Sequence, residues 1–191
     1  QIIECIVVSN SAENGGGVCN AIVDQSEIKF NSACSGGGAY GCEIWQSKLS
    51  YNVAEGGGGA AASQIRRCVI DSNIASNFGG GLMACYPTES SLIVSNTSAV
   101  GGGADGCDII NCTVVQNKAL KQGGGLNWCH AENSIIFYNT APIYQNYLDY
   151  FLGERYPSNS PVNIRYSCTY PLYQNGMNIT NDPQFVDQQN G

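Results

Sequence analysis

A repeat of about 22 residues runs through most of the chain and constrains its fold more than any other feature. Glycine triplets recur at intervals of 20 to 23 residues, and their first glycines are Gly15, Gly36, Gly56, Gly79, Gly101 and Gly123. An asparagine precedes each triplet and a seventh stands alone; these are Asn10, Asn31, Asn52, Asn73, Asn96, Asn117 and Asn139. A fixed period of this length is typical of stacked repeat architectures.

Two further columns of the repeat predict its secondary structure. Five residues before each asparagine stands cysteine or serine, and three before it stands an aliphatic residue: Val7, Ile28, Leu49, Ile70, Ile93, Val114 and Ile136. The segments around them are rich in β-branched residues that alternate with period two, which favours strands over helices. Leucine-rich, tetratricopeptide and ankyrin repeats differ in composition or length. We therefore predict an all-β, right-handed parallel β-helix of about seven coils, with two or three short strands in each coil.

Each column has a physical role in such a coil. Aliphatic side chains point inward and stack on their equivalents, while an asparagine amide at a corner donates and accepts hydrogen bonds between coils. Glycine triplets suit another corner, because glycine adopts positive φ and lets backbones approach closely. A phosphate-binding loop would need Lys and Ser or Thr after the glycines, and calcium-binding rolls need an Asp in each unit, whereas only Asp105 stands in such a place.

The composition favours one folded domain and argues against two kinds of partner. With 191 residues, of which 43% are hydrophobic and 12% charged, the chain is predicted to fold as a single unit. A formal net charge of −7 argues against nucleic acid or an anionic membrane, because both bind clustered cations. No apolar run predicts a membrane span. The first residues already resemble mid-strand sequence, so we expect a piece of a longer protein.

Several stretches also carry a family resemblance. INCTVVQNKALKQGGGL has the complete coil pattern, and NSIIFYNTA, YSCT and NITNDPQFVD follow it toward the C-terminus. In these stretches, and over nearly its whole length, the chain resembles the right-handed parallel β-helix proteins of bacterial cell surfaces, namely those related to polymorphic outer-membrane proteins and to the pectate-lyase-like superfamily. The resemblance implies the fold and an extracellular or cell-surface location. It leaves the activity open, because that superfamily includes lyases, hydrolases, epimerases and adhesins.

The variable columns give one candidate catalytic cluster. Enzymes of the superfamily that the chain resembles place their sites on the outward face of one sheet, and there the central coils bring together Glu27, Lys29, Lys48, Arg67 and Asp71. The two carboxylates stand two coils apart, about 10 Å by stacking, with cations between them. This spacing is poor for calcium and for hydrolysis by paired carboxylates. A solvated face with weak ion pairs between coils is the alternative.

The same outward columns become apolar toward the C-terminus, at Val69, Leu92, Ile135, Val94, Val115 and Phe137. An apolar surface of that size needs a cover, and we expect the chain's own tail to provide it. The predicted organisation is thus coils over residues 1–141, followed by an aromatic-rich insertion and terminal coil over 142–191 that packs on the flank. The tail is either a cap or an aromatic platform for sugar rings, and the candidate platform residues are Tyr144, Tyr147, Tyr150 and Phe151.

Most of the ten cysteines follow the repeat, which favours ladders of small buried residues over a disulfide framework. One column holds Cys5, Cys68 and Cys112, another holds Cys42, Cys85, Cys107 and Cys129, and Cys19, Cys34 and Cys168 lie outside both. The single histidine, His130, and the lack of a Cys-x-x-Cys pair argue against a metal site. No cofactor is expected.

These observations favour a non-catalytic structural or adhesive module of an extracellular or cell-surface protein. The open ends of a solenoid predispose it to pair with another copy or a neighbouring domain. The alternative is a polysaccharide-binding or polysaccharide-active module, which as an enzyme would be a polysaccharide lyase or a glycoside hydrolase.

Overall fold

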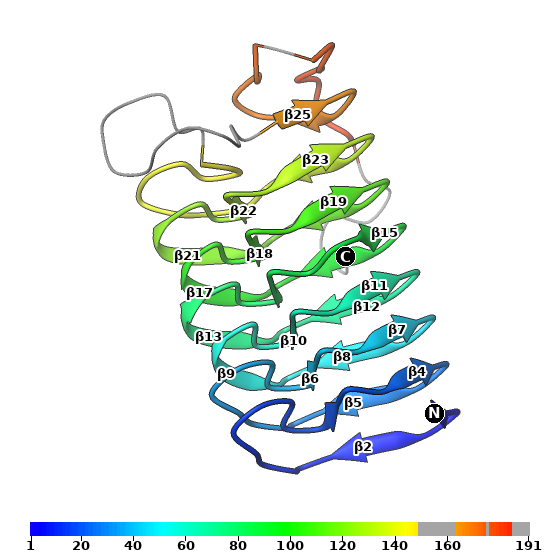
Figure 1. Ribbon diagram of the computed structural model, residues 1–191. Helices are drawn as coiled ribbons and strands as arrows, with labels where there is room; N and C mark the ends of the chain where they lie inside the picture. Colours follow the sequence, from blue (N-terminus) through cyan, green and yellow to red (C-terminus); the bar gives the residue numbers. More distant parts are fainter. Residues whose placement is uncertain (149–162, 175, 185–191) are drawn as a thin grey trace.

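The computed structural model describes residues 1–148, 163–174 and 176–184, and it shows an all-β solenoid of about six turns (Figure 1). Four parallel sheets, here named A to D in the order in which the chain visits A, B, C and D, run along the solenoid. The predicted parallel fold is confirmed. The expectation of two or three strands per coil is corrected to as many as four, because the chain bends at four corners.

Sheets A and B have eight strands each. Sheet A consists of β1 (Ile2–Ile3), β4 (Ile22–Asp24), β7 (Glu43–Trp45), β11 (Gln64–Arg66), β15 (Thr88–Glu89), β19 (Asp108–Ile110), β23 (His130–Glu132) and β25 (Asn163–Arg165). Sheet B consists of β2 (Ile6–Val8), β5 (Glu27–Lys29), β8 (Lys48–Ser50), β12 (Val69–Asp71), β16 (Leu92–Val94), β20 (Thr113–Val115), β24 (Ile135–Phe137) and β26 (Cys168–Thr169).

Sheets C and D are smaller, with four and six strands. Sheet C consists of β9 (Val53–Gly56), β13 (Ile74–Phe78), β17 (Thr97–Val100) and β21 (Lys118–Gln122). Sheet D consists of β3 (Val18–Cys19), β6 (Ala39–Tyr40), β10 (Ala60–Ala61), β14 (Leu82–Met83), β18 (Ala104–Asp105) and β22 (Leu126–Asn127).

The core lies inside the solenoid and consists of stacked equivalent residues. The central residue of each three-residue strand in sheet B points inward, and it pairs in register with its equivalent in the next coil, as Ile70 does with Leu49 and Ile93. From Ile28 to Ile136 this aliphatic column is fully buried, as the repeat predicted. Sheet A supplies a facing column that includes Ile44 and Ile65. The interior is thus largely apolar, with the buried Thr88 between Ile65 and Ile109 in the column of sheet A, and burial of each aliphatic side chain contributes roughly 1.5–3 kcal/mol.

The predicted asparagine ladder runs along the corner between sheets B and C. The backbone N–H of Asn52 donates to Oδ1 of Asn73 at 3.0 Å, and the side-chain amide of Asn52 donates to the same oxygen. The amide of Asn73 also donates to the carbonyl of Leu49 in the preceding coil. The same bonds link neighbouring asparagines from Asn10 to Asn139. Each amide therefore joins coils and satisfies backbone groups that the corner would leave unpaired.

The glycine triplets form the corner between sheets C and D, with one correction to the register. In the third coil the corner opens at Gly57, with φ +64°, because Gly56 still belongs to β9 and bridges Ser35. The second glycine of a triplet has no room for a side chain: a Cβ at Gly80 would lie 2.3 Å from the carbonyl oxygen of Gly102. The close approach of successive coils therefore accounts for the triplets.

The other corners also use the left-handed region, mostly with residues other than glycine. Gln46, Tyr51 and Ala62, with φ of 45°, 56° and 49°, open the A–B, B–C and D–A corners of one coil. In each case the next residue turns inward, as at Ser63, whose Oγ accepts a hydrogen bond from the backbone N–H of Cys42 at 3.0 Å. The left-handed conformation costs roughly 1–2 kcal/mol per residue, and the bonds between coils offset this cost.

The described parts of the C-terminal segment both extend the solenoid and contact its side. Asn146 continues the asparagine ladder by accepting hydrogen bonds from Asn139, and β25 and β26 add to sheets A and B. Further on, Asp182 accepts a hydrogen bond from the hydroxyl of Tyr138 at the B–C corner. No helix that could cross a membrane occurs among the described residues.

Candidate functional site

Four members of the predicted cluster lie together on the outer face of sheet B. Glu27 and Lys29 flank the inward residue of β5 and form an ion pair at 2.5 Å, and Lys48 of β8 forms a second pair with Asp71 of β12 at 3.4 Å. The hydrogen bond and the charge of Lys29 lower the pKa of Glu27, which keeps this carboxylate ionised. Each carboxylate thus has its own lysine, an arrangement that suits a solvated face better than proton transfer.

Arg67, the fifth member, lies apart from these four side chains. It occupies the A–B corner with φ +55°, between Arg66 at the end of β11 and the inward Cys68. Its side chain is exposed and makes no ion pair with any residue in the described ranges. The corner therefore aims Arg67 toward the outer face of sheet A, where it joins a different group of residues.

The four aromatic candidates of the tail do not form one visible platform. Tyr144 is exposed, whereas Tyr147 is only 4% exposed, donates its hydroxyl hydrogen to the carbonyl of Pro171 at 2.9 Å, and packs edge-on against Tyr173. Tyr150 and Phe151 lie outside the described residues. Within the described part, Tyr147 is a packing residue at the end of the core.

The apolar outward columns of sheet B are partly covered toward the C-terminus. Val94 and Val115 are buried, at 8% and 6% exposure, and Val69, Leu92 and Phe137 are half-buried. At the other end of the same columns Ile6 and Val8 are exposed. The face of sheet B therefore changes along the solenoid from open and charged to covered and apolar.

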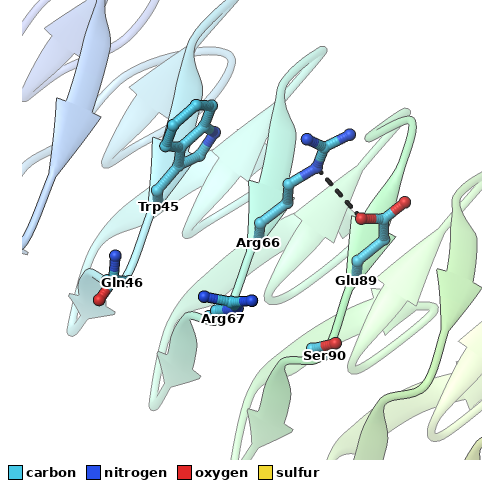
Figure 2. Close-up of a pocket in the computed structure, with 6 residues that line it drawn as sticks. All are labelled: Trp45, Gln46, Arg66, Arg67, Glu89 and Ser90. Carbon is cyan, nitrogen blue, oxygen red and sulfur yellow. Dashed lines mark ion pairs between the residues drawn. The ribbon is translucent and has the colours of Figure 1, made fainter.

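An open pocket with charged groups lies on the outer face of sheet A. It has a volume of about 310 Å³ and is lined by Trp45, Gln46, Arg66, Arg67, Glu89 and Ser90. Figure 2 shows two rows: Trp45, Arg66 and Glu89 stand on three neighbouring strands of the sheet, and the other three follow along the A–B corner. Arg66 Nε and Glu89 Oε2 form an ion pair at 3.1 Å.

The sequence repeat did contain a signal for this pocket. It was missed because positions in the repeat were counted only from the asparagines. Counted from that corner, the variable columns cover sheet B and only the edge of sheet A. Counted from the other inward ladder, which includes Cys42, Ser63 and Cys85, the position three residues later is Trp45, Arg66 and, with one extra residue in the coil, Glu89. A second reference column would have placed these side chains next to each other.

The buried thiols do not offer a reactive site. Both predicted cysteine columns are inward ladders, and their members from Cys42 onward are buried. Burial raises the pKa of Cys68 and of Cys112 to about 11. Of the three cysteines outside both columns, Cys168 is buried as well, whereas Cys19 and Cys34 are exposed. A protonated thiol is a poor nucleophile, so these ladders serve packing.

We accordingly predict selective labelling of the thiols. At pH 8, iodoacetamide should modify the three exposed cysteines, Cys5, Cys19 and Cys34, and should reach the seven buried ones only after unfolding. Peptide mass spectrometry before and after addition of denaturant measures this. Modification of Cys107 in the folded protein as fast as that of Cys19 would contradict the inward placement of the ladder.

Comparisons with models of protein families, with curated proteins and with solved structures found no match for this chain.

Proposed function

We propose that the chain is a non-catalytic structural and adhesive module of an extracellular or cell-surface protein, which presents binding surfaces on a rigid rod. The observation that carries this proposal is the unbroken register of the interior ladders, from Asn10 to Asn146 along one corner. A rod held in this way keeps equivalent outward side chains about 4.8 Å apart from coil to coil. Because these side chains are already held in place, binding of a ligand loses little conformational entropy at the surface.

The division between inner and outer columns supports a role in display. Inward positions repeat one chemistry in every coil, whereas outward positions of the same strands differ, as Trp45, Arg66 and Glu89 do in sheet A. Repetition inside is what stacking requires. The outward residues can vary without disturbing the stack and can therefore serve recognition. Aromatic and charged surface residues commonly bind ligands and partners.

The charges on sheet B support a role without catalysis. General acid catalysis by a carboxyl group needs a raised pKa, and the pKa of Glu27 is lowered by Lys29. Glu27 and Asp71 are each paired with a lysine and stand two coils apart. We therefore assign these residues to solubility and weak coil-to-coil pairing.

Association through the first coil is part of the proposal. Within the described residues β1 and β2 pair on one side only, and open strand edges are templates for another strand. A coil of a second copy, or of a neighbouring domain, would continue sheets A and B. Sedimentation over a range of concentrations tests self-association, and a monomer at every concentration would remove it from the proposal.

The test of the non-catalytic role is a turnover assay. The folded protein is incubated with acidic and neutral polysaccharides, and unsaturated products and new reducing ends are measured. We expect no product above the level given by the Lys48→Ala variant, which removes the cation closest to Asp71. Turnover that is lost in Lys48→Ala or Arg67→Ala would refute the proposal and establish the alternative, a polysaccharide lyase or hydrolase.

A further inference from the structure

The pocket on sheet A combines three features that together select a ligand. The first is an exposed aromatic side chain. Trp45 is 40% exposed on the outer face of β7, at one end of the pocket (Figure 2). A large aromatic ring kept on a rigid strand provides a flat apolar surface with little loss of side-chain entropy on binding.

The second feature is a pair of neighbouring guanidinium groups. Glu89 pairs with Nε of Arg66, which favours one orientation of this exposed side chain. Figure 2 shows the other two nitrogens of Arg66 directed away from Glu89. Arg67, the next residue, lies on the corner beside Gln46 and Ser90 and has no ion pair in the described part of the chain. Two arginines and one glutamate leave a net positive charge at the pocket, on a protein with a net charge of −7.

The third feature is a row of polar side chains that extends the pocket along the solenoid. The A–B corner carries Gln46, Arg67 and Ser90 at the pocket, and the corner residues of the flanking coils are also exposed and polar. These flanking residues are Gln25, Asn111 and Asn133. Amide side chains donate and accept hydrogen bonds, which is the pattern needed to bind the hydroxyl groups of a chain.

The shape of the pocket favours an extended ligand over a small molecule. It is open to solvent, and its three strands span roughly 10 Å, whereas sites for small molecules usually bury most of the ligand in a cleft. A shallow groove with a net positive charge suits a polymer that carries negative charges at intervals. A nucleic acid is disfavoured, because affinity for its phosphates requires more clustered cations than the two arginines provide.

We propose that an acidic polysaccharide binds along this corner, with one sugar ring against Trp45 and its carboxylate or sulfate group bound by Arg66 and Arg67. Arginine binds such groups through two parallel N–H bonds, and Glu89 holds Arg66 ready for this. The inference rests on the proposed function, since it identifies the ligand that the display surface would take.

The experiment measures binding of the folded protein to immobilised polygalacturonate, heparin and dextran by biolayer interferometry. We expect binding to an acidic polysaccharide, weaker at higher salt, and none to neutral dextran. Comparison of polygalacturonate with heparin identifies carboxylate or sulfate as the anionic group. Trp45→Ala and Arg67→Gln should each reduce the affinity about tenfold or more, because each removes one principal contact.

Matched controls separate this site from the general surface. Trp128→Ala removes a tryptophan of the same 40% exposure at the D–A corner, and Lys118→Gln removes an exposed cation from sheet C; both should leave binding unchanged. Thermal unfolding of each variant verifies that it is folded. The inference is overturned if no polysaccharide binds, if the controls weaken binding as much as the pocket variants do, or if single-stranded DNA binds more tightly than the polysaccharides.

The two proposals fail in different ways. Absence of binding would remove the acidic polysaccharide as ligand and leave the non-catalytic role intact. Polysaccharide turnover that depends on the pocket residues would refute the non-catalytic role but would support the pocket as the binding site.

Discussion

Replacing Asn73 by alanine is expected to lower the free energy of unfolding by roughly 4 kcal/mol, since each buried polar group left without a partner costs about 1–3 kcal/mol. Oδ1 of Asn73 accepts hydrogen bonds from the backbone and the side-chain amide of Asn52, and its own amide donates to the carbonyl of Leu49. Asn52 and Asn73 are fully buried, so water cannot replace these bonds. Equilibrium denaturation followed by circular dichroism measures the change.

The matched control is Asn10→Ala. Asn10 is the same residue in the same ladder, but it lies exposed in the first coil, where it donates to Asn31 and accepts no bond from a described asparagine. Its loss should cost less than about 1 kcal/mol. Equal effects of the two substitutions would show that the buried ladder does not provide the stability assigned to it.

The second large effect is expected for Gly80→Ala, which should cost about 3 kcal/mol or more because it overpacks a rigid backbone contact. The added Cβ would stand 2.3 Å from the carbonyl oxygen of Gly102 and 2.7 Å from backbone atoms of Thr97. These atoms can move only if neighbouring coils separate, which would stretch the bond from Gly80 N–H to the carbonyl of Gly101. Loss of soluble expression or a lower denaturation midpoint is the readout.

Gly106→Asn is the control. It shows whether the loss of stability comes from the lack of space at Gly80 or from the replacement of any glycine. Gly106 has φ +58°, and its Cβ would meet only the hydroxyl of Tyr86 at 3.5 Å. Equivalent corners of other coils hold Asn20 and Trp128 in the same left-handed conformation. Gly106→Asn should therefore change stability by no more than about 1 kcal/mol. A loss as large as that of Gly80→Ala would contradict the account of the triplets.

The parts of the fold that repeat could be predicted from the sequence. The asparagines, the aliphatic column around Ile70 and the inward cysteines each recur at one period, and a parallel solenoid is the arrangement that stacks them. The left-handed corners at Gln46 and Ala62 were missed, because many residue types occupy those positions and glycine or asparagine stands there in only some coils. The start of the glycine triplet in the third coil was also misplaced, because four glycines follow one another there and the triplet could begin at either of the first two.

The candidate site was harder to predict, because outward residues have no period. Counting from the asparagine corner correctly grouped Glu27 with Lys48, which are register partners in neighbouring strands. It also added Arg67, which the A–B corner turns away toward sheet A. Which way a corner residue points depends on its φ, and this is a property of the folded coil. The pocket beside Trp45 was therefore missed, because the columns were counted from the asparagines alone.

The central claim is that each coil lies in register on the next, and scalar couplings across hydrogen bonds measured by NMR test it most directly. For the ladder, the backbone nitrogen of Asn52 should couple to the side-chain carbonyl carbon of Asn73, and that of Asn73 to the side-chain carbonyl carbon of Asn96. Couplings that instead connect these nitrogens to groups within their own coil, or that skip a coil, would contradict the stacked register on which the rod and its binding surfaces depend.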